Sequence, residues 1–173
     1  MAIKLYDASA ALFIQTLGAM EGFLARGLKH FQENNIDTAQ VIETRLFSDM
    51  LPFRYQVQAA IGHSLGAIQG AQGGEFKPPY GNPKSDYAAL QKEVADAITA
   101  LKAIQPADVE ALLGKDVSFN LGERVLPFTA ENFLLTFSLP NFHFHATTAY
   151  DILRMKGVPL GKRNYLGAIK MKT

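Results

Sequence analysis

The segment ENFLLTFSLPNFHFHATTAYDILRMKG, residues 131–157, decides the fold of this chain. At about 100° per residue, three neighbouring stripes of a helix over this segment are mainly apolar, which indicates burial on most of its circumference. Thr129 and Glu131 form a plausible helix start, and Gly157 followed by Pro159 forms a plausible stop. The pattern predicts a long, nearly buried helix around which the other helices pack.

Two histidines in this segment point in nearly opposite directions. His143 and His145 are two residues apart, so on a regular helix they cannot hold one ion together. Pro140 removes a backbone donor and should bend the helix just before Asn141. The bend either leaves carbonyls free beside a pocket or simply fits the helix around a curved core.

Upstream of this segment, the apolar periodicity predicts three further long helices. They cover residues 7–34, 53–70 and 86–104, the last with Ser85 as its N-cap. Residues 72–84 contain three glycines and three prolines, which predicts a loop with no helix or central strand. Residues 117–126 predict a small β-hairpin, and residues 158–173 a basic, irregular tail. The fold class is therefore all-α: one domain over residues 1–173, a four-helix bundle with a small β-hairpin before the last helix. The interior of such a bundle commonly hosts metal or ligand sites.

Small residues form a second ridge on the helix predicted over residues 53–70. Ala59, Gly62, Gly66 and Gly70 follow one another at helical spacing, with His63 and Gln56 at the edge of the ridge. Such a ridge permits close helix approach, either inside the fold or across a homodimer. We therefore expect a homodimer, with a small-molecule ligand as a further partner.

Composition excludes several classes of function. Seventeen basic and sixteen acidic residues give a net charge of +1, and no basic run carries interleaved aromatics, so we expect no nucleic-acid partner. Cysteine is absent, which excludes disulfides, thiolate metal sites and a cysteine nucleophile. The N-terminus lacks the apolar core of a signal peptide, and no uninterrupted apolar run has membrane-spanning length. We expect a cytoplasmic protein without a membrane partner.

Three phrases carry a resemblance to a known family. They are LYDAS at residues 5–9, RLFSDMLPFRYQVQ at residues 45–58, and PNFHFHATTAY with ILRMKGVPLGK at residues 140–162. His145 followed by Ile152-Leu153-Arg154 and Gly157 resembles the end of the last helix in the DinB/YfiT-like superfamily. Taken together, the phrases are similar to an uncharacterised DinB-related family over nearly the whole chain.

The resemblance implies a divalent metal held by three histidines, one on the second helix and two at i, i+4 on the last. These positions fall on His63, Asn141 and His145 in this sequence. An asparagine oxygen is a weak ligand for a borderline ion such as zinc or nickel. His63 also lies off the main apolar stripe of its helix, so a regular helix would not turn it towards His145.

The resemblance and these departures lead to two functional hypotheses. The first is a DinB-like bundle with a degenerate metal or ligand pocket and no reaction, and the alternative is a metal-dependent small-molecule (thiol) transferase or hydrolase. His145 is then either a metal ligand or a buried neutral histidine, hydrogen-bonded to Asn141 or to a neighbouring helix.

Overall fold

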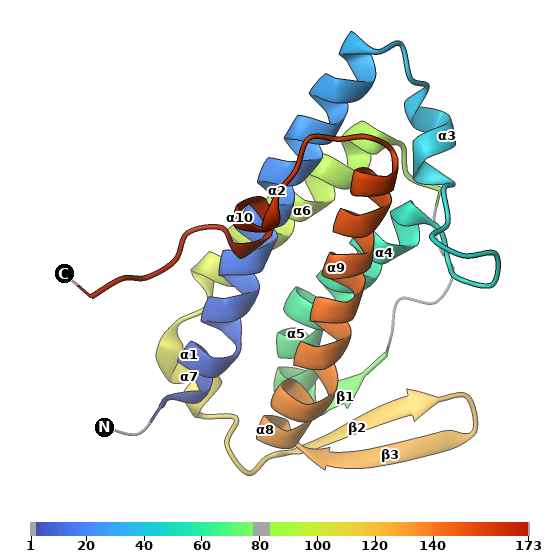
Figure 1. The fold of residues 1–173 in the computed structure, drawn as a ribbon. Helices are drawn as coiled ribbons and strands as arrows, with labels where there is room; N and C mark the ends of the chain where they lie inside the picture. Colours follow the sequence, from blue (N-terminus) through green and yellow to red (C-terminus); the bar gives the residue numbers. More distant parts are fainter. Residues whose placement is uncertain (1–2, 78–83, 173) are drawn as a thin grey trace.

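The computed structural model describes residues 3–77 and 84–172, and most of these residues are helical (Figure 1). A small three-stranded sheet lies at one end of the helices (Figure 1). The glycine and prolines predicted as loop residues at positions 78–83 lie outside the described residues.

The first predicted helix is observed as α1 (Leu5–Ala8) followed by α2 (Ala10–Glu33). The break falls at Ser9, where φ is −131° and ψ is −85°, and the Ser9 hydroxyl donates to the Leu5 carbonyl. A short helix, α3 (Thr38–Ile42), follows, with the Asp37 carboxylate accepting from the Ala39 N–H. The helical stretch Leu5–Glu33 contains an 18-residue window that is long and apolar enough to cross a membrane. Half of that window is buried inside the fold. Burial inside the fold accounts for this apolar character.

The second long helix is continuous but irregular. It consists of α4 (Phe53–Ile61), a π-helical segment η1 (Gly62–Gly66) and α5 (Ala67–Gly73). It extends three residues beyond the predicted end, because Gly74 at φ +77° provides the left-handed stop. The prediction that residue 72 already lies in a loop is therefore wrong.

The last long helix is also continuous. It consists of α8 (Ala130–Asn132), a π-helical segment η2 (Phe133–Ser138) and α9 (Leu139–Met155). Pro140 lies near the start of α9, directly after the π-helical turn. A proline ring clashes with the carbonyl four residues earlier in a regular helix, and a wider turn at this point relieves that clash. Pro140 is accommodated by this turn, and the helix does not break.

The third long helix is α6 (Tyr87–Ala103), followed by the short helix α7 (Pro106–Glu110). Its N-cap is Asp86, whose carboxylate accepts from the Ala89 N–H at 2.7 Å. The predicted cap, Ser85, instead donates its hydroxyl to Glu93. The tail is not wholly irregular either, because α10 (Lys162–Leu166) forms within it and contacts α2.

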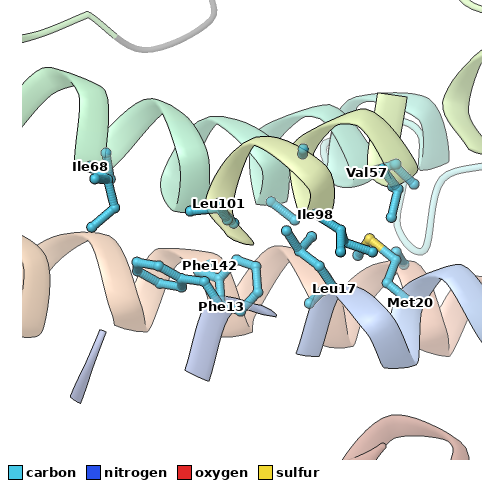
Figure 2. Packing of buried hydrophobic residues seen from close by; sticks show 14 of the residues in the cluster. Phe13, Leu17, Met20, Val57, Ile68, Ile98, Leu101 and Phe142 are labelled. Carbon is cyan, nitrogen blue, oxygen red and sulfur yellow. The ribbon is translucent and has the colours of Figure 1, made fainter. Parts of the chain in front are cut away.

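The core lies between the long helices. Helix α2 contacts α6 and α9, and α4 contacts the same two helices. Figure 2 shows Phe13, Leu17 and Met20 of α2 meeting side chains from the other three long helices. The Phe13 and Phe142 rings pack edge to face with centroids 5.0 Å apart, which joins α2 directly to α9.

Gly27 of α2 lies directly against the Tyr87 side chain of α6. A Cβ atom at Gly27 would lie 2.4 Å from the Tyr87 hydroxyl, which donates to the Leu24 carbonyl at 2.9 Å. We expect Gly27→Ala to reduce the free energy of unfolding by about 1–3 kcal/mol, because the buried tyrosine must shift and weaken this hydrogen bond. Gly18→Ala on the same helix is the control, since its Cβ meets nothing within 4 Å and should stabilise by up to about 1 kcal/mol. Urea unfolding measures both, and equal changes in the two variants would contradict the packing argument.

The sheet differs from the predicted hairpin. Its strands are β1 (Glu75–Phe76), β2 (Asp116–Leu121) and β3 (Arg124–Thr129), in the order β1-β2-β3. Strands β2 and β3 pair antiparallel as expected, but β1 adds to β2 in parallel, so the sheet is mixed. Strand β1 approaches α5 at Gly70, where a Cβ would lie 3.1 Å from the Phe76 Cα. This glycine of the small-residue ridge therefore serves a close approach inside the fold.

Strand β3 forms an outer edge of the sheet and carries a proline. Pro127 lies opposite Ser118, and the Ser118 N–H donates to Gly74 on the β1 side, away from β3. Residues paired in this way both point their N–H groups away from each other. The N–H that Pro127 lacks would therefore have faced the open edge, where a proline is tolerated.

Candidate functional site

The structure brings His63 and His145 together. Their ring centroids lie 5.7 Å apart, and their planes are within 13° of parallel. The expectation that His63 would be turned away from His145 is therefore wrong. His63 comes from η1 and His145 from α9, two segments that contact each other.

His63 lies within a π-helical turn, to which the regular helical pattern used for the sequence does not apply directly. The pattern assumed a constant rotation of about 100° per residue, but the π-helical turn over Gly62–Gly66 rotates less per residue. Side chains within it are shifted around the helix axis relative to a regular α-helix. His63 is 7% exposed and therefore lies in the interior, although its predicted position lay off the main apolar stripe of the helix.

Gln56 sets the orientation of His145. The Gln56 Oε1 lies 2.7 Å from the His145 Nδ1, and the Gln56 Nε2 donates to the Leu51 carbonyl at 2.8 Å. The carbonyl of Leu51 only accepts, so it holds the amide with its oxygen towards the histidine. His145 therefore carries its proton on Nδ1, and its Nε2 retains a lone pair. The sequence placed Gln56 beside His63 on the helix, but gave no sign of this support across to α9.

His63 is enclosed by rings and lacks a partner for one nitrogen. Its Nδ1 is buried and has no hydrogen-bond partner among residues 3–77 and 84–172. The rings of Phe76 and Phe137 lie with centroids 5.5 and 5.7 Å from that of His63. A buried polar atom without a partner costs roughly 1–3 kcal/mol. Such a cost at the meeting point of two distorted helices marks this position as a candidate binding site.

Asn141 is turned back along its own helix. Its Nδ2 donates to the Phe137 carbonyl at 2.8 Å, four residues earlier. This is one of the carbonyls that the bend near Pro140 was expected to leave free, and the asparagine amide satisfies it. The partner of His145 is thus Gln56 on a neighbouring helix, and the alternative partner, Asn141, makes a local bond instead.

His143 belongs to a separate cluster. Its Nδ1 lies 3.1 Å from the Tyr165 hydroxyl of α10, which also accepts from the Thr147 hydroxyl at 3.0 Å. This bond draws the basic tail against α9. The two histidines of α9 thus face different surroundings, as their spacing predicts.

Burial keeps the histidine pair neutral. Desolvation lowers the pKa of His145 to about 4, and desolvation together with the nearby His145 lowers the pKa of His63 to about 4. At neutral pH each ring therefore offers one N–H and one lone pair. Neutral imidazoles are the form that binds metal ions and that accepts hydrogen bonds from ligands.

These pKa values predict acid-sensitive stability. Both native pKa values lie below the ordinary value of 6.5, so between pH 6.5 and 4 the unfolded chain binds more protons than the native one. We expect the free energy of unfolding to fall as the pH is lowered through this range, by up to about 1.4 kcal/mol per pH unit for each histidine. Urea unfolding at pH 7, 6 and 5 measures the slope.

The control for this slope is His145→Gln, which removes one of the two groups. Its slope should be smaller than that of the parent chain by up to about 1.4 kcal/mol per pH unit, the share of one histidine. The pKa of His143 is also lowered by partial burial, and its contribution stays in both proteins. A slope unchanged by the substitution would show that His145 does not titrate in this range.

The donor set fits a metal ion only in part. Among residues 3–77 and 84–172, no group of three His, Cys, Asp or Glu side chains is placed to hold one ion. His63 and His145 supply two imidazoles, and the remaining position of the implied site is the amide of Asn141. Zinc sites generally use at least three protein ligands, so the residues present form an incomplete set.

Comparison with known proteins defines the class and then the family. The fold is similar to the crystal structure of a DinB family member protein from Shewanella denitrificans, with a TM-score of 0.81 and 26% sequence identity over 98% of this chain and 95% of that one. The chain is thus a DinB-like protein, as the sequence phrases indicated. It belongs to the family described as a domain of unknown function, DUF1993, whose model matches residues 5–166. No curated protein matches this chain.

Proposed function

We propose that this protein is a binding protein built on a DinB-like four-helix bundle, in which the metal site implied by the resemblance has become a degenerate pocket. His63 and His145 form its binding centre, and the bundle carries out no reaction there. The carrying observation is the pairing of these two neutral imidazoles, His63 buried and His145 half-buried, at a ring distance of 5.7 Å.

The free ring atoms indicate what this centre binds. His145 keeps a lone pair on Nε2 because Gln56 occupies Nδ1, and the Nδ1 of His63 is buried without a partner. A divalent ion such as zinc or nickel, or the polar group of a small molecule, satisfies atoms of this kind. With only two imidazoles, we expect the ion to be held weakly and in exchange with solvent.

Metal uptake by tag-free protein tests this proposal. Equilibrium dialysis against Zn²⁺ or Ni²⁺, followed by elemental analysis, should show weak uptake approaching one ion per chain. The variant His145→Ala should lose it, whereas His143→Ala should retain it because His143 faces Tyr165 on the other side of α9. Uptake that is absent at millimolar metal, or equal in His145→Ala, would remove the histidine pair as the binding centre.

The enzyme alternative has less support in the site. The alternative is metal-dependent, and among the described residues His63 and His145 form an incomplete ligand set for a catalytic ion. The resemblance alone supports this alternative.

We also propose that the protein forms a homodimer. The surface exposes large apolar side chains, among them Phe47, which is 67% exposed, and Phe144, which is 56% exposed and packs against the His145 ring. Light scattering at micromolar concentration should give twice the mass of one chain, and Phe144→Ser should shift the equilibrium towards the monomer. A monomer at every concentration would exclude this assembly.

A further inference from the structure

A groove of about 530 Å³ runs along the outer side of the second long helix, between that helix and α6. Neither His63 nor His145 lines it, so it is distinct from the candidate site above. Its volume is in the range of small-molecule sites, which hold ligands in roughly 300–1,000 Å³.

Small residues make this groove. Gly62 and Gly66 of η1 line one side, and Ala97 and Ala100 of α6 line the other. A Cβ at Gly66 would have only the Phe76 ring near it, at 3.9 Å, so the backbone there is not forced to be glycine by internal packing. Two of the small residues that the sequence grouped in a ridge therefore border a hollow.

The polar lining of the groove is rich in hydrogen-bond acceptors, beside the Tyr55 hydroxyl and the Gln69 amide, which can both donate and accept. Glu93 and Asp96 supply carboxylates, and Gln58 supplies an amide oxygen that is buried without a partner among the described residues. Within the part of the chain that the structure describes, no lysine or arginine lines the groove. Lys92, from outside it, pairs with Asp96 at 2.5 Å, so Glu93 carries the negative charge available to a ligand.

The carboxylate of Glu93 is held in place. It accepts from the Ser85 hydroxyl at 2.7 Å and from the Gln58 Nε2 at 3.3 Å, and the Ser85 oxygen accepts from the same Nε2 at 3.0 Å. These bonds fix the Gln58 amide with its donors towards Ser85 and Glu93, which leaves its oxygen free. Each carboxylate oxygen accepts two hydrogen bonds, so Glu93 keeps acceptor capacity for a ligand.

We propose that this groove binds a small organic cation: a primary ammonium group on an apolar body the size of a single aromatic ring. The ammonium donates to Glu93 and to the Gln58 oxygen, and the apolar body lies along Gly62, Gly66 and Ala100. An ammonium carries three donors and no acceptor, which matches a lining that offers acceptors and a negative charge. A neutral alcohol of the same shape lacks the charge.

Titration with matched probes tests this proposal. 2-Phenylethylamine should bind at least about 10-fold more tightly than 2-phenylethanol, because a hydrogen bond to a charged group contributes roughly 1.5–3 kcal/mol. ¹H–¹⁵N spectra locate the ligand, and the Gly62 and Gly66 amides should shift while those of Gly161 and Gly122 do not. Equal binding of amine and alcohol, or shifts elsewhere, would overturn the proposal.

Substitutions in the groove separate the contribution of its negative charge to amine binding from the contribution of its shape. Glu93→Gln should weaken amine binding about 10-fold and leave alcohol binding unchanged, whereas Asp96→Asn should have a smaller effect because Lys92 already pairs with it. Ala100→Leu, at a partly exposed position, should fill the groove and abolish binding of both probes. An unchanged amine affinity in Glu93→Gln or in Ala100→Leu would overturn the proposal. Glu93→Gln should leave Zn²⁺ uptake at the histidine pair intact, so failure of the histidine site and failure of the groove are distinguishable.

Discussion

Replacing Asn141 by histidine should convert the weak histidine pair into a three-imidazole metal site. Position 141 is one helical turn before His145, so a histidine there projects from the same helix face. Three imidazoles match the ligand set of many zinc sites, and we expect Zn²⁺ or Ni²⁺ affinity to rise by roughly 100-fold or more. Isothermal titration of tag-free protein measures the gain, and a stoichiometric ion should survive desalting.

The control is Thr136→His, which adds a histidine at an exposed position of the same long helix. It should leave metal affinity near that of the parent chain. The double variant Asn141→His, His145→Ala should lose most of the gain, because one of the three ligands is missing again. An affinity unchanged by Asn141→His would mean that position 141 does not face the pair, and the degenerate-site proposal would fall.

Replacing Phe142 by alanine should produce the largest loss of stability among the single changes considered. The side chain is 0% exposed and packs against Phe13 in the centre of the core (Figure 2). Truncating a buried phenylalanine removes apolar contacts and leaves a cavity that the helices fill only in part, which costs about 3–5 kcal/mol. Urea unfolding should show a lower midpoint with a similar slope.

Phe144 provides the matched control two residues along the same helix. It is 56% exposed, so at concentrations where the chain is a monomer Phe144→Ala should change the free energy of unfolding by less than about 0.5 kcal/mol. Similar losses in the two variants would show that the core is not organised around the inward face of α9. The comparison also tests the assignment of faces on which the histidine geometry depends.

The periodicity of the sequence predicted those features of the structure that depend on regular helices and strands. The four long helical segments, the pairing of β2 with β3 and the opposite directions of His143 and His145 all follow from local patterns. The DinB-like resemblance, carried by the phrases around residues 5–9, 45–58 and 140–162, is confirmed by the family and structure comparisons.

Departures from regularity were not predictable in the same way. The π-helical turns at Gly62–Gly66 and Phe133–Ser138 have no simple signature in the sequence, and the first of them contains His63, whose ring lies beside that of His145. Strand β1 has two residues and follows a glycine pair, too short a stretch for any alternation to show. In the sequence, Gln56 is an ordinary polar residue. Its hydrogen bond to His145 depends on the packing of α9 against α4.

Pro127 has a consequence for assembly. Strand β3 carries exposed Val125 and Leu126, and a strand of that composition at an open edge invites another chain to add to it. The missing donor interrupts the ladder that an added strand would need, so growth of fibre-like stacks from this side is discouraged. The homodimer proposed above is therefore expected to form through the helical surfaces and not by strand addition at this edge.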